Sequence, residues 1–119
     1  MLSSFEEKEG YILYKTKGFY TYQDMKTLIE YVDQLIEKDP NTKFLLDYSG
    51  MTNFEQKALK TAYDRADKGF PKGVKIAIVY PKKGFLSFVL NMVAKAMIRT
   101  AKFFKDPQEA KEWLLDQSS

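Results

Sequence analysis

The stretch that decides the fold is KFLLDYSGMTNFEQKAL, residues 43–59. Its apolar run FLL, residues 44–46, is typical of a central strand that is covered on both faces of a sheet. The turn-forming residues 47–50 follow directly, so we expect the strand to stop at Asp47.

A helix is expected directly after this strand. Thr52 and Glu55 have the spacing of a capping box, in which the N-cap and N3 side chains accept hydrogen bonds from each other's backbone N–H groups. The helix is expected to continue to about Asp67, before Gly69 and Pro71. The residues expected on its inner face are Ala58, Leu59, Ala62 and Ala66.

The segments before this unit predict a hairpin and another helix. Residues 11–17 are rich in β-forming side chains and end at a glycine, and we expect them to pair with residues 2–8. Thr21 and Asp24 have the spacing of a capping box, and the helix that begins there should end before Pro40. Its apolar residues recur at steps of three and four: Met25, Leu28, Ile29, Val32, Leu35 and Ile36.

The segments after it continue the alternation of strands and helices. Residues 74–80 should form a buried strand that ends at Pro81, residues 85–99 a third helix, and residues 101–104 a last short strand. The residues expected to start and anchor a terminal helix are Asp106, Pro107, Glu109, Ala110, Trp113 and Leu114.

This order of elements predicts an α/β fold. Strands that alternate with helices form a sheet that is covered by helices and is at least partly parallel. A chain of 119 residues suffices for one hydrophobic core, so we expect a single domain over residues 1–119.

The composition excludes several classes of enzyme. The chain has no histidine and no cysteine, so it lacks the usual general base, the Ser–His triads and the thiolates that attack substrates or bind metals. Paired carboxylates can hydrolyse glycosides or bind magnesium, and the candidates are Asp47, Glu55, Asp64 and Asp67. Asp47 at a strand end and Glu55 in a first helical turn favour loop ordering and capping instead. We therefore expect no catalytic residue, no cofactor and no metal site.

The charge pattern is uneven but not strong. The net charge is +3, and residues 82–105 carry six basic side chains and no acidic one. Aromatic rings interleaved with lysines can bind single-stranded nucleic acid, but most of these rings fall where the core needs them, so we expect no nucleic-acid partner. The first ten residues contain no apolar run, so we expect no signal peptide and a cytoplasmic location.

Three segments carry a resemblance to a known family: residues 43–59, VKIAIVYP at residues 74–81, and AKFFKDPQEAKEWLL at residues 101–115. Together they resemble the SpoIIAA-like branch of the STAS superfamily, which has the fold of anti-sigma-factor antagonists and is related to small lipid carriers of the CRAL-TRIO type. The resemblance spans nearly the whole chain as an order of elements. It implies a mixed four- to five-stranded sheet with helices mainly on one side.

The resemblance also implies a contact surface. In the antagonists, the loop after the central strand leads to a serine at a helix start, which a partner kinase phosphorylates. This chain matches the lead-in at Asp47, Ser49 and Gly50, but Gln56 stands where the acceptor belongs. The resemblance therefore implies a protein-contact role without a phosphoacceptor serine. The candidate partner-binding residues are Asp47, Ser49, Gly50, Thr52, Glu55 and Gln56.

The third expected helix offers a second candidate surface. On a helical wheel, large apolar residues fall beside its sheet-facing side and continue into two bases. Such a stripe is typical of a partner groove, a self-association surface or an anionic membrane interface, unless another element covers it. The candidate residues for binding a partner or lipid are Phe85, Phe88, Met92, Lys95 and Arg99.

These observations favour a non-catalytic binding module. The leading interpretation is protein–protein interaction or a regulatory role, and the alternative is binding of a lipid, an apolar small molecule or a membrane surface. The expected partner is accordingly an unidentified protein, or a lipid or anionic membrane surface, and a homodimer is possible.

Overall fold

The chain folds around a mixed five-stranded sheet. The computed structural model describes residues 3–81 and 101–116. The strands are β1 (Ser4–Lys8), β2 (Tyr11–Tyr20), β3 (Lys43–Phe54), β4 (Lys75–Val79) and β5 (Ala101–Phe104). They follow one another across the sheet in chain order. β1 is antiparallel to β2, and every later pair of neighbours is parallel. The fold class expected from the sequence is confirmed.

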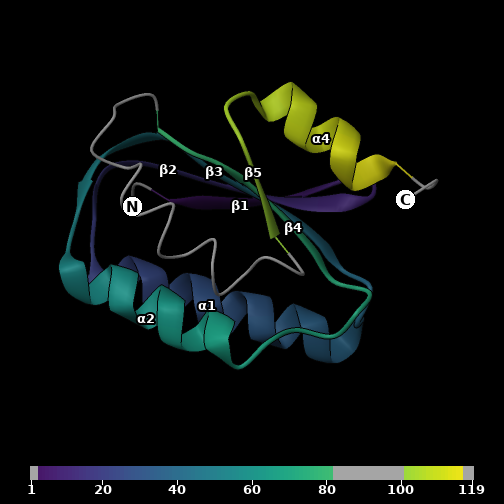
Figure 1. Cartoon of the computed structure of the whole chain (residues 1–119), viewed down its shortest axis with the longest axis horizontal. Coiled ribbons are helices and arrows are strands. Elements are labelled where there is room, and N and C mark those ends of the chain that lie inside the picture. The colour runs from purple at the N-terminus through teal and green to yellow at the C-terminus, as the bar shows by residue number, and fades with distance from the viewer. Residues whose placement is uncertain (1–2, 82–100, 117–119) are drawn as a thin grey trace.

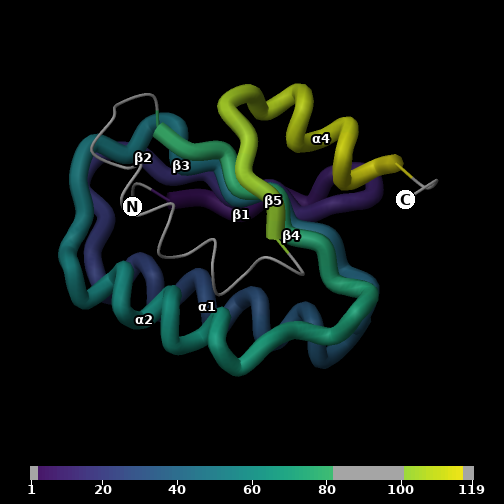
Figure 2. Tube along the Cα trace, in the orientation of Figure 1, coloured from purple at the N-terminus to yellow at the C-terminus, as the bar shows by residue number. Residues whose placement is uncertain are grey.

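The described helices cover both faces of the sheet unequally. α1 (Tyr22–Lys38) and α2 (Gln56–Asp67) lie side by side on one face, and α4 (Pro107–Leu115) lies on the other (Figure 1; the chain trace is in Figure 2). Parallel crossovers are right-handed, so two successive crossovers that advance in the same direction across the sheet place their helices on the same face. This arrangement puts α1 and α2 together.

Two hydrophobic clusters lie on opposite faces of the sheet. Side chains of a strand alternate between faces, so Phe44 and Leu46 join the larger cluster under α1 and α2, and Leu45 joins the smaller one under α4. The smaller cluster consists of Leu45, Ala77, Val79, Ala110 and Leu114.

The hairpin and the start of α1 are as the sequence predicts. β1 pairs with β2 from Ser4↔Lys15 to Lys8↔Tyr11. The capping box of α1 is complete: the backbone N–H of Asp24 donates to Thr21 Oγ1 at 3.0 Å, and the backbone N–H of Thr21 donates to Asp24 Oδ2 at 2.9 Å.

The start of α4 is also as predicted, but one of its expected anchors is not buried. The side chain of Asp106 accepts a bond from the backbone N–H of Gln108 at the N-cap. Ala110 and Leu114 are fully buried, whereas Trp113 is only partly buried. Its ring packs against Phe104 at the rim of the smaller cluster, with centroids 5.8 Å apart.

Two strands run further than expected. β2 passes through Gly18, which has a φ of 75°, and ends at Tyr20. β3 passes through the turn-forming residues 47–50 and ends at Phe54. The two extensions pair with each other. The register shifts after Lys15 and after Gly18, so β3 contains extra residues at these β-bulges while its pairing with β2 continues. The expectation that the central strand stops at Asp47 was wrong because β2 supplies a partner beyond it.

The second capping box was also a wrong prediction. Thr52 lies inside β3, and α2 begins at Gln56 with Glu55 as an N-cap that makes no side-chain capping bond. Instead, Glu55 Oε1 accepts a bond of 2.9 Å from the backbone N–H of Tyr22, the first residue of α1. Glu55 thus caps the neighbouring helix rather than its own.

The described residues omit one expected element. The helix predicted over residues 85–99 lies outside them. None of the helices in the described ranges is long and apolar enough to cross a membrane.

The two threonines provide a matched test of these caps. Thr21→Ala removes a real capping bond and is expected to lower the free energy of unfolding by about 0.5–2 kcal/mol. Thr52→Ala removes an exposed strand side chain and is expected to change it by less than about 0.5 kcal/mol. Reversible urea titration of both variants gives the comparison, and equal losses would contradict the assignment.

Candidate functional site

The residues predicted to bind a partner lie along one end of β3 and at the start of α2. β4 pairs with β3 only as far as Asp47↔Val79, so within the described residues the rest of β3 has a neighbour on the β2 side alone. Ser49, Gly50, Thr52 and Gln56 are exposed. The predicted loop is therefore an irregular strand end that presents polar side chains.

Asp47 and Glu55 differ from the other residues of this set because each has a structural role. Asp47 is buried, and its Oδ1 accepts a bond of 2.9 Å from the backbone N–H of Ser49. Glu55 caps α1, as described above. The ordering role that the sequence suggests for Asp47 is thus seen, although within a strand rather than a loop.

The second predicted surface is not placed. Phe85, Phe88, Met92, Lys95 and Arg99 lie outside the described residues. Their roles in dimerisation or membrane binding stay predictions.

A cavity that the sequence did not reveal lies between α1, α2 and the sheet. Its volume is about 130 Å³. The sheet contributes Leu46, Ile76, Ile78 and Phe103, and α1 contributes Met25, Leu28, Ile29 and Val32. The residues from α2 are Ala58, Leu59, Ala62, Arg65 and Ala66. Most of the wall is therefore hydrocarbon.

The cavity follows from the small side chains on α2. Ala58, Ala62 and Ala66 are spaced by four residues, so they lie one above another on the same face of the helix. A methyl group reaches only a short way towards the sheet, so the row leaves a volume that larger residues would fill. The sequence correctly predicts that these alanines face inwards, but periodicity gives direction and not volume.

One end of the cavity borders a chain of hydroxyl groups. Tyr20 and Tyr48 line the cavity, and their hydroxyl oxygens are 3.3 Å apart. Tyr20 is also hydrogen-bonded to the Tyr14 hydroxyl at 2.8 Å. Beyond it, the Tyr14 hydroxyl donates to Ser3 Oγ at 3.2 Å, and Ser3 Oγ donates to Thr16 Oγ1 at 2.9 Å.

The direction of this chain is fixed only at its serine end, where Tyr14 donates to Ser3. A hydroxyl can donate one proton and can also accept. In the Tyr14–Tyr20 and Tyr20–Tyr48 pairs either hydroxyl can be the donor. The hydroxyl group of Tyr48 lies at the end of the chain.

Burial also sets the protonation of these tyrosines. Burial is the main cause that raises the pKa of Tyr14, Tyr20 and Tyr48 above the ordinary value of 10.0. The charged phenolate loses its hydration in such a place, so the neutral form is favoured. The hydroxyl chain therefore stays fully protonated through neutral and mildly alkaline pH.

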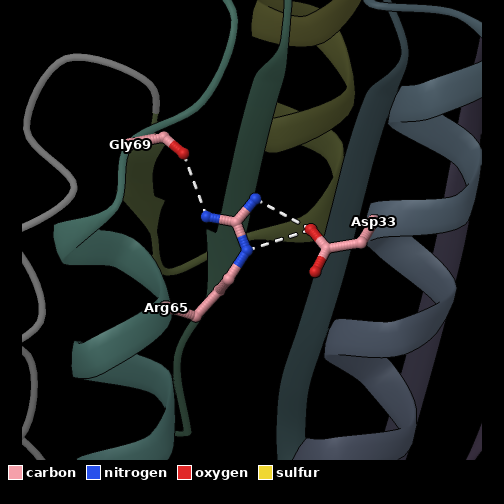
Figure 3. A network of polar contacts seen from close by, with 3 residues as sticks. All are labelled: Asp33, Arg65 and Gly69. Atoms are coloured by element: carbon pink, nitrogen blue, oxygen red, sulfur yellow. Dashed lines mark hydrogen bonds and ion pairs between the residues drawn. The ribbon is translucent and has the colours of Figure 1, made fainter.

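A fixed cation, Arg65 in the last turn of α2, lines the other end of the cavity. Figure 3 shows its polar contacts. Its Nε and Nη2 both donate to Asp33 Oδ1, at 2.9 and 2.8 Å, and its Nη1 donates to the carbonyl oxygen of Gly69 at 2.9 Å. The guanidinium carbon lies 4.3 Å from the centroid of the Phe70 ring. The Arg65 side chain is 18% exposed, so it sits at the boundary between the cavity and solvent.

Sequence reasoning missed Arg65 as a site residue. A weak signal was present, because Arg65 is three residues after Ala62 and so falls on the inward stripe of α2. A single charged residue on such a stripe usually packs its aliphatic part along the core and keeps its charged group in water, so it is not expected to form a binding site. Among the described residues that line the cavity, Arg65 is the only charged one.

The described residues do not assemble a metal site. Within residues 3–81 and 101–116, no group of three or more potential metal ligands comes together. What the cavity offers is volume, apolar contact, hydroxyl groups at the tyrosine end and a cation at the other.

These features define a small α/β domain of the STAS type, with parallel crossovers on one face and a cavity beneath them. The model of the SpoIIAA-like family matches residues 11–115, and the chain belongs to that family. The predicted resemblance is confirmed.

A solved structure shows the same fold. The chain is similar to an uncharacterized protein of the DUF3478 family from Shewanella loihica PV-4, whose crystal structure has a SpoIIAA-like fold. The two are 19% identical, with a TM-score of 0.60, and the match covers 94% of this chain and 91% of the other. No curated protein matches the sequence.

The raised pKa values of the tyrosines predict an alkaline loss of stability. Above pH about 10, tyrosines of the unfolded chain lose protons while Tyr14, Tyr20 and Tyr48 of the folded chain keep theirs. The unfolded state then binds fewer protons, so the free energy of unfolding falls as the pH rises. Urea titrations at several pH values above neutral measure this fall.

Tyr48→Phe is the matched control for this prediction. Tyr48 lies at the end of the chain, so removal of its hydroxyl group leaves the hydrogen bond between Tyr20 and Tyr14 in place. The variant is expected to lose less stability at alkaline pH than the native protein. Identical pH profiles for the two proteins would show that Tyr48 ionises normally in the folded state.

Proposed function

We propose that this chain is a non-catalytic binding module that takes up a small apolar molecule in the cavity between α2 and the sheet. The observation that carries the proposal is the cavity itself, walled by aliphatic and aromatic side chains from α1, α2 and the sheet. The SpoIIAA-like fold is generally that of a non-enzymatic binding domain, which agrees with this role. Of the two interpretations left open by the sequence, the geometry favours the apolar ligand.

The size of the cavity limits the size of the ligand. An apolar cavity of about 150 Å³ stays dry and accepts a benzene ring, and this one measures about 130 Å³. A chain of roughly six carbons is of similar size. Each methylene moved from water into such a place contributes about 0.8 kcal/mol, equivalent to roughly a fourfold gain in affinity.

A series of linear alcohols tests the proposal. Affinity measured by isothermal titration calorimetry is expected to rise roughly fourfold per methylene from butanol to hexanol. The rise should stop once the cavity is full. Absence of heat and of amide chemical-shift changes across the whole series would refute a ligand cavity.

Filling the cavity should separate binding from stability. Ala62→Leu places three more carbons into the space and is expected to abolish hexanol binding. Filling an apolar void commonly stabilises a protein by about 0.5–2 kcal/mol, and we expect a gain in that range by urea titration. Lys60→Leu adds a leucine on the exposed face of the same helix and should leave hexanol binding unchanged.

The sign of the stability change decides the outcome. A loss of more than about 1 kcal/mol in Ala62→Leu would mean that other side chains of the protein already occupy the space, since overpacking is destabilising. That result, together with no binding of hexanol to the native protein, would rule out the proposed function.

A second candidate function, protein contact at the end of β3, is favoured by a separate observation. Ser49, Gly50 and Thr52 are exposed on a stretch of β3 that β4 does not reach. Polar side chains on a strand end with a neighbour on one side are accessible to a partner protein. The surface is the one that the family resemblance implied.

Substitution at this surface tests the second candidate. Ser49→Arg combined with Thr52→Arg adds bulk and charge to the surface. The amount of partner protein that becomes cross-linked directly to this variant is expected to be at least tenfold lower than with the native protein. Gln34→Arg, on the exposed face of α1, is the control and should leave recovery unchanged. If the double variant and the Gln34→Arg control recovered equal amounts of the partner protein, the end of β3 would not be the partner-binding surface.

A further inference from the structure

We propose that the ligand of the cavity is a small carboxylic acid whose apolar tail lies beneath the alanine row and whose carboxylate pairs with Arg65. This inference rests on the proposed function and specifies its ligand. Two features of the described residues support it: the fixed cation that lines the cavity and the apolar volume beside it.

Arg65 is held in place and still has bonding capacity. A guanidinium carries five N–H donors, and Asp33 and Gly69 accept from three of them. Two N–H groups therefore have no partner among the described residues. Because the Phe70 ring and two bonded neighbours already fix the guanidinium, a ligand would lose little affinity to the ordering of this side chain.

The chemistry of Arg65 selects an anion with oxygen acceptors. An arginine–carboxylate hydrogen bond is charge-assisted and is stronger than a bond between neutral groups. Asp33 already places one carboxylate beside Arg65, but on the solvent-facing side. Solvent there screens the repulsion between the Asp33 carboxylate and the carboxylate of a ligand. A carboxylate that reaches Arg65 from the cavity side would complete the bonding of the guanidinium.

The charge of the wall sets the orientation of the ligand. Among the described residues that line the cavity, Arg65 is the only charged one, whereas the tyrosine end offers neutral hydroxyl groups. A charge-assisted hydrogen bond is stronger than a bond between neutral groups, and a cation attracts a carboxylate. The head group is therefore favoured at Arg65.

Hexanoate and hexanol form the discriminating pair of probes. They share a six-carbon skeleton that matches the volume of the cavity and differ only at the head. Isothermal titration calorimetry is expected to show hexanoate binding at least about tenfold more tightly than hexanol, in line with a hydrogen bond to a charged group. Acetate, which has the head without the tail, should show no measurable binding.

Substitution of Arg65 should remove this preference without removing the cavity. Arg65→Gln is expected to bind hexanoate no better than it binds hexanol. Arg65→Lys keeps the charge but loses the planar fork, so its preference should lie between the two. Lys60→Gln removes an exposed cation from the same helix and should leave the preference intact.

The outcomes distinguish this inference from the function on which it rests. Equal affinity of the native protein for hexanoate and hexanol would overturn the carboxylate and leave the apolar cavity supported. The carboxylate is likewise overturned if Lys60→Gln abolishes the preference as fully as Arg65→Gln does. Failure of both probes to bind would overturn the proposed function as well.

Discussion

The parallel pairing of β2 with β3 is the constraint on which the rest of the structure depends. It continues to Tyr20↔Phe54, well past the point where β4 ends. Parallel strands that end side by side start their following helices at the same level. α1 begins just after Tyr20 and α2 just after Glu55, and Glu55 bonds the first backbone N–H of α1. The two helices therefore run together over one face, and the space between them and the sheet is set by their side chains.

Under the proposed function, the cavity reflects a balance between stability and binding in that space. Large residues from α1 and the sheet approach it, but α2 presents a row of three alanines. Empty apolar volume lowers stability because its walls lose dispersion contacts and remain unfilled. Arg65 at the end of the row is also unusual on an inward stripe, yet its three bonds and its contact with Phe70 satisfy much of its polar character. A binding site gives both features a common explanation.

Much of the fold could be predicted from local patterns, whereas the site could not. The order of the described elements, the Thr21 capping box and the Asp106 cap depend on neighbours along the chain, and the structure confirms these three predictions. Thr52 has a spacing like that of Thr21 but lies in a strand, because β2 offers β3 a ladder that local sequence does not reveal. The cavity was missed for a similar reason, since side-chain periodicity cannot show how far apart the facing surfaces lie.

The sheet also acts as a partition between two interiors. The cluster beneath α4 and the cluster beneath α1 and α2 have no side chain in common, because consecutive strand residues such as Leu45 and Leu46 point to opposite sides. Changes in the two clusters that lie more than about 7–10 Å apart and share no neighbour are expected to have additive effects on stability. No described residue of α4 lines the cavity. Variation on the exposed face of α4 can accordingly leave the walls of the other interior in place.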